Sequence, residues 1–126
     1  MTNDAAISED VRRFVLTSVP SVPYLEALLL LRARPQQGCD AAELARRLYV
    51  PEANARELLD ALCAAHIAVR EGEVCHYAPH TAELRDVLDA LARAYSTRLI
   101  EVTHLIHSKT LRQAQQFADA FKLRKE

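Results

Sequence analysis

Four arginines and one asparagine have the types and spacing that suit contact with a nucleic acid: Arg46, Arg47, Asn54, Arg56 and Arg70. A guanidinium group binds phosphate oxygens or the edge of guanine, and an asparagine amide can pair with adenine. We expect Arg46, Arg47 and Arg70 to contact phosphates, and Asn54 and Arg56 to reach base edges.

Carboxylates lie close to these cations in the sequence. Residues 41–80 contain four arginines and six acidic residues, a local charge of −2, and Glu52, Glu57 and Asp60 share a segment with Asn54 and Arg56. Phosphates repel carboxylates, so this charge pattern opposes DNA binding. Two hypotheses therefore stay open. The protein binds DNA through these residues, or it keeps the fold of a DNA-binding protein and acts as an adaptor for a protein partner.

Two helices and a tight turn are predicted to position these side chains. Asp40 can cap a helix over residues 41–48, whose composition favours helix and whose leucines share one face. Pro51 interrupts this helix and suits the start of another, which we expect over residues 52–65. Residues 67–78 carry β-type side chains around Glu71-Gly72, which predicts a β-hairpin with its two-residue turn there.

Two more helices are predicted before this region, and Cys39 is expected to add a short strand beside the hairpin. Ser8 can cap a helix over residues 9–17 that presents Val11, Phe14 and Val15 on one side. The segment from 22 to 33 is apolar nearly all round, which is typical of a buried helix.

A long helix is predicted from residue 82 to about 107. Apolar residues follow steps of four and three along it, as they do in the seam between paired helices. The helix would span about 39 Å, which exceeds what a small core can cover. We expect part of the stripe to pack on the helix at 9–17 and the rest to form a homodimer interface. The expected interface residues are Leu84, Leu88, Leu91, Tyr95, Val102 and Leu105.

The C-terminal segment, residues 109–126, holds five basic and two acidic residues. Phe117 and Phe121 are four apart, as on one side of an amphipathic helix. We expect this segment to dock on its own chain or on a dimer partner. A mobile arm that binds an acidic protein or a phosphate is the alternative, and a membrane partner is not expected because the apolar face is short and lacks tryptophan.

Composition excludes several other classes. The 126 residues, half of them hydrophobic, suffice for one core. No apolar run reaches the length of a membrane span, and the first residues lack the pattern of a secretion signal, so a cytoplasmic location is expected. The three cysteines suit reduced thiols. Motifs of catalysis, cofactor binding or metal binding are absent, and His104 and His107 alone are too few to hold a metal, so none of these activities is expected.

The segment from Ala41 to Ala65 resembles the helix-turn-helix of the MarR and PadR groups of bacterial winged-helix regulators. The matching residues are Ala42-Glu43-Leu44-Ala45-Arg46-Arg47-Leu48, then Val50-Pro51, then Leu58, Leu59 and Leu62. The resemblance implies a mainly α (α+β) winged helix-turn-helix protein that binds operator DNA as a dimer. We expect a winged-helix domain with its N-terminal helix at 1–80, a dimerisation helix at 81–108 and a basic tail at 109–126.

Overall fold

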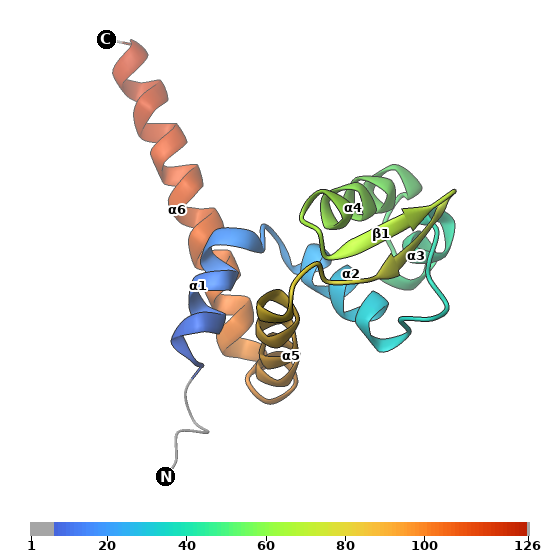
Figure 1. The fold of residues 1–126 in the computed structure, drawn as a ribbon. Coiled ribbons are helices and arrows are strands. Elements are labelled where there is room, and N and C mark those ends of the chain that lie inside the picture. Colours follow the sequence, from blue (N-terminus) through green and yellow to red (C-terminus); the bar gives the residue numbers. More distant parts are fainter. Residues whose placement is uncertain (1–6, 126) are drawn as a thin grey trace. The chain divides into compact units, whose positions relative to one another are not determined.

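The computed structural model describes residues 7–125, with side chains as far as residue 120. This part of the chain is mainly helical, with six helices and one small antiparallel sheet (Figure 1), which confirms the expected mainly α class in this coarse form. In chain order the elements are α1 (Glu9–Ser18), α2 (Val22–Ala33), α3 (Ala41–Leu48), α4 (Glu52–Ala64), β1 (Ala68–Glu71), β2 (Val74–Tyr77), α5 (Ala82–Thr97) and α6 (Leu99–Lys125). Within residues 7–125, no single helix is both long and apolar enough to cross a membrane.

The chain divides into two compact units. One consists of residues 23–89, and the other contains the described residues 7–22 and 90–125. The first helix therefore belongs with the C-terminal helices, whereas the sequence placed it with the helix-turn-helix. α1 lies against α6, and Val11 and Val15 on α1 are buried, as are Val102 and Ile106 on α6. The expected packing of the C-terminal stripe on this helix is confirmed.

The unit of residues 23–89 is built around α2. One broad side of this helix is buried, whereas Pro23, Glu26 and Ala33 are exposed. The buried residues are Tyr24, Leu25, Ala27, Leu28 and Leu31. Arg32 on α2 donates through Nε and Nη2 to Asp89 on α5, at 3.1 and 2.9 Å. The largest fully buried side chains of this unit are Leu25, Leu28, Leu31, Leu44, Leu59, Leu62, Ile67 and Leu88.

The two helices that carry most of the expected contact residues have well-defined ends. Asp40 caps α3, since its Oδ1 accepts a hydrogen bond of 2.9 Å from the amide of Glu43. α3 ends at Tyr49, which adopts a left-handed conformation with φ 59°. Pro51 precedes α4 as its N-cap, so only three residues separate the helices. These boundaries confirm the predicted helix, turn and helix.

The hairpin has the predicted strands, but its turn lies one residue further along. Glu71 pairs with Val74, so the two-residue loop is Gly72–Glu73 and not Glu71-Gly72. Gly72 has φ 65°, which fits the first position of a type II′ turn, where glycine is strongly preferred. Cys39 lies beside the hairpin as expected, but it forms only one isolated antiparallel bridge with Cys75 and no strand.

The predicted continuous helix from 82 to 107 is wrong, because α5 ends at Thr97 and α6 begins at Leu99 in a different direction (Figure 1). Ser96 and Thr97 both donate side-chain hydrogen bonds to the carbonyl of Arg93, at 3.0 and 2.9 Å. Such bonds compete with the helix backbone and bend or end helices. α6 then continues through the segment that the sequence set apart as a tail at 109–126.

Three of the six expected dimer residues are buried within one chain. Leu88, Leu91 and Val102 are 0% exposed within a single chain, so they offer no surface to a second copy. The other three, Leu84, Tyr95 and Leu105, are half-buried. For Leu88, Leu91 and Val102 the regular spacing therefore reflects burial within the chain, because packing against a core and packing against a partner require the same helical periodicity.

Candidate nucleic-acid interface

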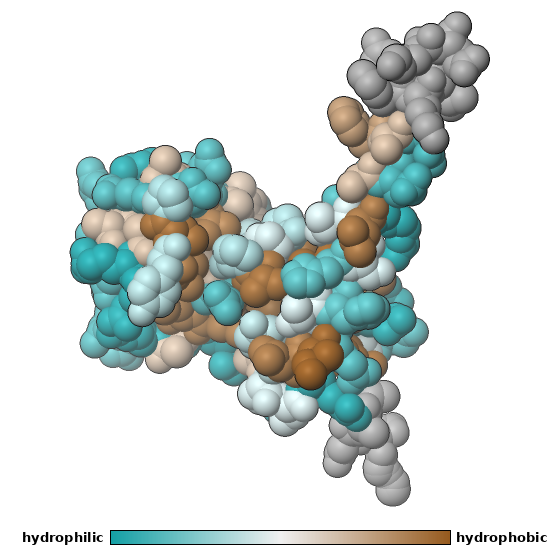
Figure 2. Space-filling model, turned by 180° about the vertical axis from the view of Figure 1, so that it is seen from behind, coloured by the Kyte–Doolittle hydropathy of each residue, from teal (hydrophilic) through white to brown (hydrophobic). Residues whose placement is uncertain are grey.

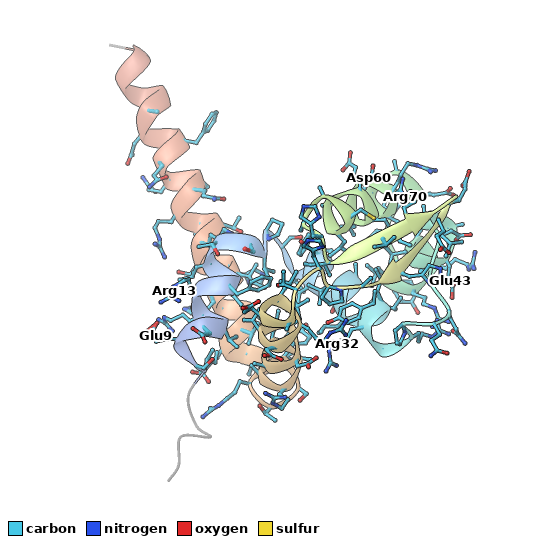
Figure 3. The ribbon with its side chains drawn as sticks, viewed as in Figure 1. Glu9, Arg13, Arg32, Glu43, Asp60 and Arg70 are labelled. Atoms are coloured by element: carbon cyan, nitrogen blue, oxygen red, sulfur yellow. The ribbon has the colours of Figure 1, made fainter. Side chains whose placement is uncertain are left out.

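The five residues expected to contact nucleic acid are all exposed and lie within one compact unit. Arg46 and Arg47 occupy the last turn of α3, whereas Asn54 and Arg56 lie near the start of α4. The turn at residues 49–51 joins these two pairs. Arg70 lies apart from them on β1, with its side chain beside α4 (Figure 3).

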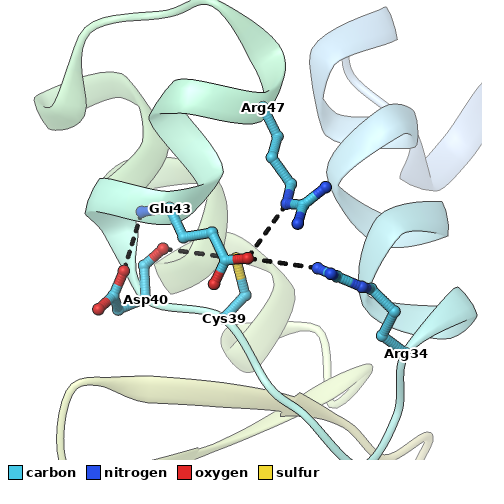
Figure 4. A network of polar contacts seen from close by, with 5 residues as sticks. All are labelled: Arg34, Cys39, Asp40, Glu43 and Arg47. Carbon is cyan, nitrogen blue, oxygen red and sulfur yellow. Dashed lines mark hydrogen bonds and ion pairs between the residues drawn. The ribbon is translucent and has the colours of Figure 1, made fainter.

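Arg47 is held in a network of charges at the end of α3 (Figure 4). Glu43 Oε2 accepts from Arg47 Nε at 3.1 Å and from Arg34 Nη1 at 3.3 Å. The hydrogen bond from Arg47, together with that from Arg34, holds the pKa of the Glu43 carboxyl below its usual range. One carboxylate thus balances part of the charge of two arginines. Both Nη groups of Arg47 still have donors beyond this bond.

The other two arginines also pair with carboxylates. Arg56 Nη2 donates to Glu52 Oε2 at 3.1 Å, one turn earlier on α4. Arg70 Nη2 donates to Asp60 Oδ1 at 2.7 Å, which joins β1 to α4 (Figure 3). Three of the six acidic residues in 41–80, Glu43, Glu52 and Asp60, are therefore partners of arginines.

Arg46 differs from the other arginines of this surface. Among the side chains that the structure describes, it forms no ion pair, and it is exposed. An unpaired guanidinium keeps its full charge and all five N–H donors for an external anion. Arg46 is consequently the strongest phosphate-binding candidate of the five.

Tyr49 is a member of this surface that sequence reasoning missed. Its side chain is 94% exposed, although its backbone is in the left-handed region. It lines a shallow hollow of about 420 Å³ with Leu30, Glu43, Arg46 and Arg47. The available signal was an aromatic residue directly after a pair of arginines, at the point where the helix had to end.

The position of Tyr49 is energetically unfavourable. A left-handed conformation costs an L-residue about 1–2 kcal/mol, so helices usually place glycine there. An exposed ring gains almost no burial energy in return. His66 has the same conformation, so Tyr49 belongs to the candidate interface because it lines the hollow beside Arg46 and Arg47.

The hollow contains donors for an anion, together with the carboxylate of Glu43, which is paired with Arg47. Two guanidinium groups and a phenol hydroxyl can all donate hydrogen bonds to phosphate oxygens. Among residues 7–120, no group of three or more histidine, cysteine or acidic side chains is arranged to hold a metal. His104 and His107 instead line a shallow hollow on α6 with Leu99, Ile100 and Thr103.

A second exposed surface lies on α6. Beyond its contact with α1 the helix continues with all side chains of residues 111–120 exposed. Leu111 is 70% and Phe117 75% exposed, and apolar side chains are visible on this projecting part of the helix in Figure 2. Phe121 and the basic residues Lys122, Arg124 and Lys125 lie outside the residues whose side chains are described.

Comparison with protein-family models, with curated proteins and with solved structures finds no match to this chain.

Proposed function

We propose that this protein is a winged-helix transcriptional regulator that binds duplex DNA as a homodimer. α3 and α4 would form the helix-turn-helix, and the β1–β2 hairpin would be the wing. The observation that carries the proposal is the exposed hollow around Arg46, Arg47 and Tyr49, next to exposed Asn54 and Arg56 at the start of the following helix. In such modules the start of the second helix enters the major groove, and neighbouring residues contact the backbone.

The ion pairs of this surface are compatible with phosphate binding. Arg47 uses Nε for Glu43, and Arg56 uses Nη2 for Glu52, so each keeps further donors for DNA. A carboxylate that holds a guanidinium also orders its long side chain before DNA arrives. The cost is a weaker net charge, so we expect modest affinity and a low salt slope.

Salt-dependent DNA binding tests the proposal. Fluorescence anisotropy with duplex fragments from near its own gene should give binding at about 50 mM salt, where screening is weak. Arg46→Ala combined with Arg47→Ala should weaken binding to all sequences and flatten the slope of log K against log salt by about 1.8. The matched control is Arg12→Ala combined with Arg13→Ala, which removes the same charge from exposed positions on α1. Equal effects of both double variants would contradict the proposed surface.

The second candidate function is an adaptor that binds a basic protein. It is favoured by the exposed carboxylates Glu52, Glu57 and Asp60 on α4, and by Glu71 and Glu73 around the hairpin loop. Absence of any anisotropy change with micromolar protein at about 50 mM salt would reject the DNA-binding proposal and favour this one.

The homodimer is proposed to form through the outer face of α6, and not through Leu88, Leu91 and Val102, which are buried within one chain. Positions in steps of three and four along this face are uncharged: Ile100, Thr103, His107, Thr110, Ala114 and Phe117. The charged residues Glu101, Lys109, Arg112 and Asp119 lie on other sides of the helix. A second copy can therefore meet the same face without placing like charges opposite one another.

Phe117→Glu and Gln116→Glu form a matched pair for this interface. Both residues are exposed and adjacent, but only Phe117 lies on the uncharged face. Losing a buried phenylalanine costs about 1.5–3 kcal/mol, so Phe117→Glu should weaken the dimer tenfold or more, and Gln116→Glu should not. Sedimentation equilibrium measures the dimer dissociation constants of both variants. A wild-type chain that stays monomeric at high concentration would refute the dimer.

A further inference from the structure

Two cysteines from different elements meet beneath the hairpin. Cys63 Sγ, near the end of α4, lies 3.7 Å from Cys75 Sγ in β2, and neither is in a disulfide. Cys75 is fully buried, whereas Cys63 is partly exposed. Cys63 is therefore the more exposed residue of the pair, and its sulfur lies next to that of the buried Cys75.

A cation lies beside this pair. Arg70 is the cross-strand partner of Cys75, so both side chains lie on the same face of the hairpin. Its bond of 2.7 Å to Asp60 keeps the guanidinium near the end of α4. A hydrogen bond with the Cys75 sulfur, followed by that with Asp60, raises the pKa of Arg70. Burial raises the pKa of the Cys63 thiol, and the charge of Arg70 opposes part of that rise.

The third cysteine is placed differently. Cys39 is also paired with Cys75 across the isolated bridge, but its Sγ donates to the carbonyl of Asp40 at 3.5 Å. Burial raises the pKa of the Cys39 thiol to about 11, with the nearby carboxylates of Glu43 and Asp40 adding to the effect. Cys39 is thus a buried, protonated thiol with a partner of its own.

We propose that Cys63 and Cys75 form a site of reversible oxidation by a peroxide, which closes a disulfide between α4 and β2. The sulfur of the partly exposed Cys63 attacks one peroxide oxygen; the O–O bond breaks, and a sulfenic acid and one water form from hydrogen peroxide. The Cys75 sulfur then attacks the Cys63 sulfur, and the hydroxyl leaves as a second water. The two thiols lose two electrons and two protons, and the peroxide is reduced to water.

The geometry requires only a small movement. The sulfurs must approach by about 1.7 Å to reach bonding distance, which side-chain rotation of Cys63 at the end of α4 can supply. Burial, followed by the hydrogen bond with Cys75, raises the pKa of the Cys63 thiol, so the first step is expected to need excess peroxide and not trace amounts. A small dithiol should reverse the reaction by thiol–disulfide exchange.

The chemistry does not depend on the proposed DNA binding. If the protein binds DNA as proposed, the Cys63–Cys75 disulfide would link α4, the helix that enters the major groove, to the β1–β2 hairpin, which is the wing. The oxidation itself is measured on the free full-length chain, so its failure and the failure of DNA binding are separate results.

The test is thiol counting and peptide mapping after treatment with hydrogen peroxide. The wild-type chain should fall from three reactive thiols, measured after unfolding, to one, and a Cys63–Cys75 peptide should appear that dithiothreitol removes. Cys39→Ser should still form this disulfide within one chain. Cys63→Ser should not form it and should keep the thiol of Cys39.

Several results would overturn the proposal. These are a Cys39–Cys75 disulfide as the main product, a disulfide between chains, or oxidation of Cys63 to sulfinic acid without a disulfide. Cys63→Ser is the decisive variant because Cys63 is only partly buried, so the variant should keep its circular dichroism spectrum. Cys75→Ser places a hydroxyl in a fully buried position, so this variant is a second control only if its circular dichroism spectrum matches that of the wild type.

Discussion

Replacing Tyr49 by glycine should make the protein more stable and, under the proposed function, a weaker DNA binder. Tyr49 has φ 59° and is 94% exposed, so its ring contributes almost no burial energy to the fold. Glycine removes the strain of the left-handed backbone, which is about 1–2 kcal/mol. Glycine also gives the unfolded chain more conformational freedom, which destabilises the folded state by roughly 0.5–1 kcal/mol. The expected net gain is about 0.5–1 kcal/mol, or a rise in Tm of roughly 2–5 °C.

The binding effect has the opposite sign because Tyr49 lines the hollow with Arg46 and Arg47. Loss of one hydrogen bond from the phenol hydroxyl to a phosphate costs about 1 kcal/mol, which is roughly a fivefold loss of affinity. Urea unfolding measures the first effect, and fluorescence anisotropy with the bound DNA fragment measures the second. Tyr49→Phe should keep the wild-type stability and lose the same hydrogen bond.

His66→Gly is the matched control. His66 follows the end of α4 with φ 63°, and the amide of Ile67 donates to the carbonyl of Leu62, as in a helix end of the Schellman type. It therefore has the same backbone strain as Tyr49 but does not line the hollow. Its ring also contacts that of His80, with centroids 5.4 Å apart, so His66→Gly should gain less stability than Tyr49→Gly and keep its DNA affinity. A clear loss of stability in Tyr49→Gly would refute the strain argument, and equal affinities of the two glycine variants would remove Tyr49 from the interface.

Two further predictions concern positions outside the candidate interface. Gly38→Ala should lose about 3 kcal/mol or more of unfolding free energy, because the φ of Gly38 is 70° and the new methyl group would overlap Val74. Gly72 has φ 65° but open space around it, so Gly72→Ala should lose only about 1–2 kcal/mol. Chemical denaturation of both variants checks this, and equal losses would contradict the close approach of Gly38 to the hairpin. Burial raises the pKa of the Cys39 thiol from 9.0 to about 11, so the unfolded chain releases this proton at a lower pH than the folded chain does. The free energy of unfolding should therefore fall by about 2–3 kcal/mol as the pH rises from 9.0 to about 11. Cys39→Ala should remove that part of the alkaline loss in urea titrations at several pH values, and an unchanged pH profile would contradict it.

Helix starts were the features most readable from the sequence. Ser8 and Asp40 were recognised as caps, and their side chains accept hydrogen bonds from the amides of Val11 and Glu43. Pro51 was recognised as the residue between two helices. These signals are local, since a side chain three residues from its partner or a ring that fixes φ acts before any tertiary contact forms.

The break between α5 and α6 could not be read in the same way. Apolar residues keep their helical spacing on both sides of Arg98, so periodicity alone predicts one helix. Ser96 and Thr97 carried the missing signal, but such residues also occur inside continuous helices when their side chains face solvent. The position of the hairpin turn was missed by one residue because glycine is accepted at either place in a two-residue loop.

The ion pairs account for the difference between the charge of the sequence and the chemistry of the surface. The count of −2 over residues 41–80 treats every charge as independent. In the structure Glu43 pairs with Arg47 and with Arg34, which lies outside that window, and Asp60 pairs with Arg70. A pair a few ångströms apart acts on a distant phosphate as a dipole, whose field decays faster than that of a single charge.

The charges that a phosphate would feel most strongly are consequently those without an internal partner. Among the described side chains these include Arg46 at the hollow and Glu57 on α4, both exposed. Arg46→Ala should therefore weaken DNA binding more than Arg56→Ala, whose guanidinium is already balanced by Glu52, and Glu57→Gln should strengthen it. Anisotropy titrations at one low salt concentration rank the three variants. If Arg56→Ala instead had the largest effect on every sequence tested, the ion pairs would not control the electrostatics of this surface.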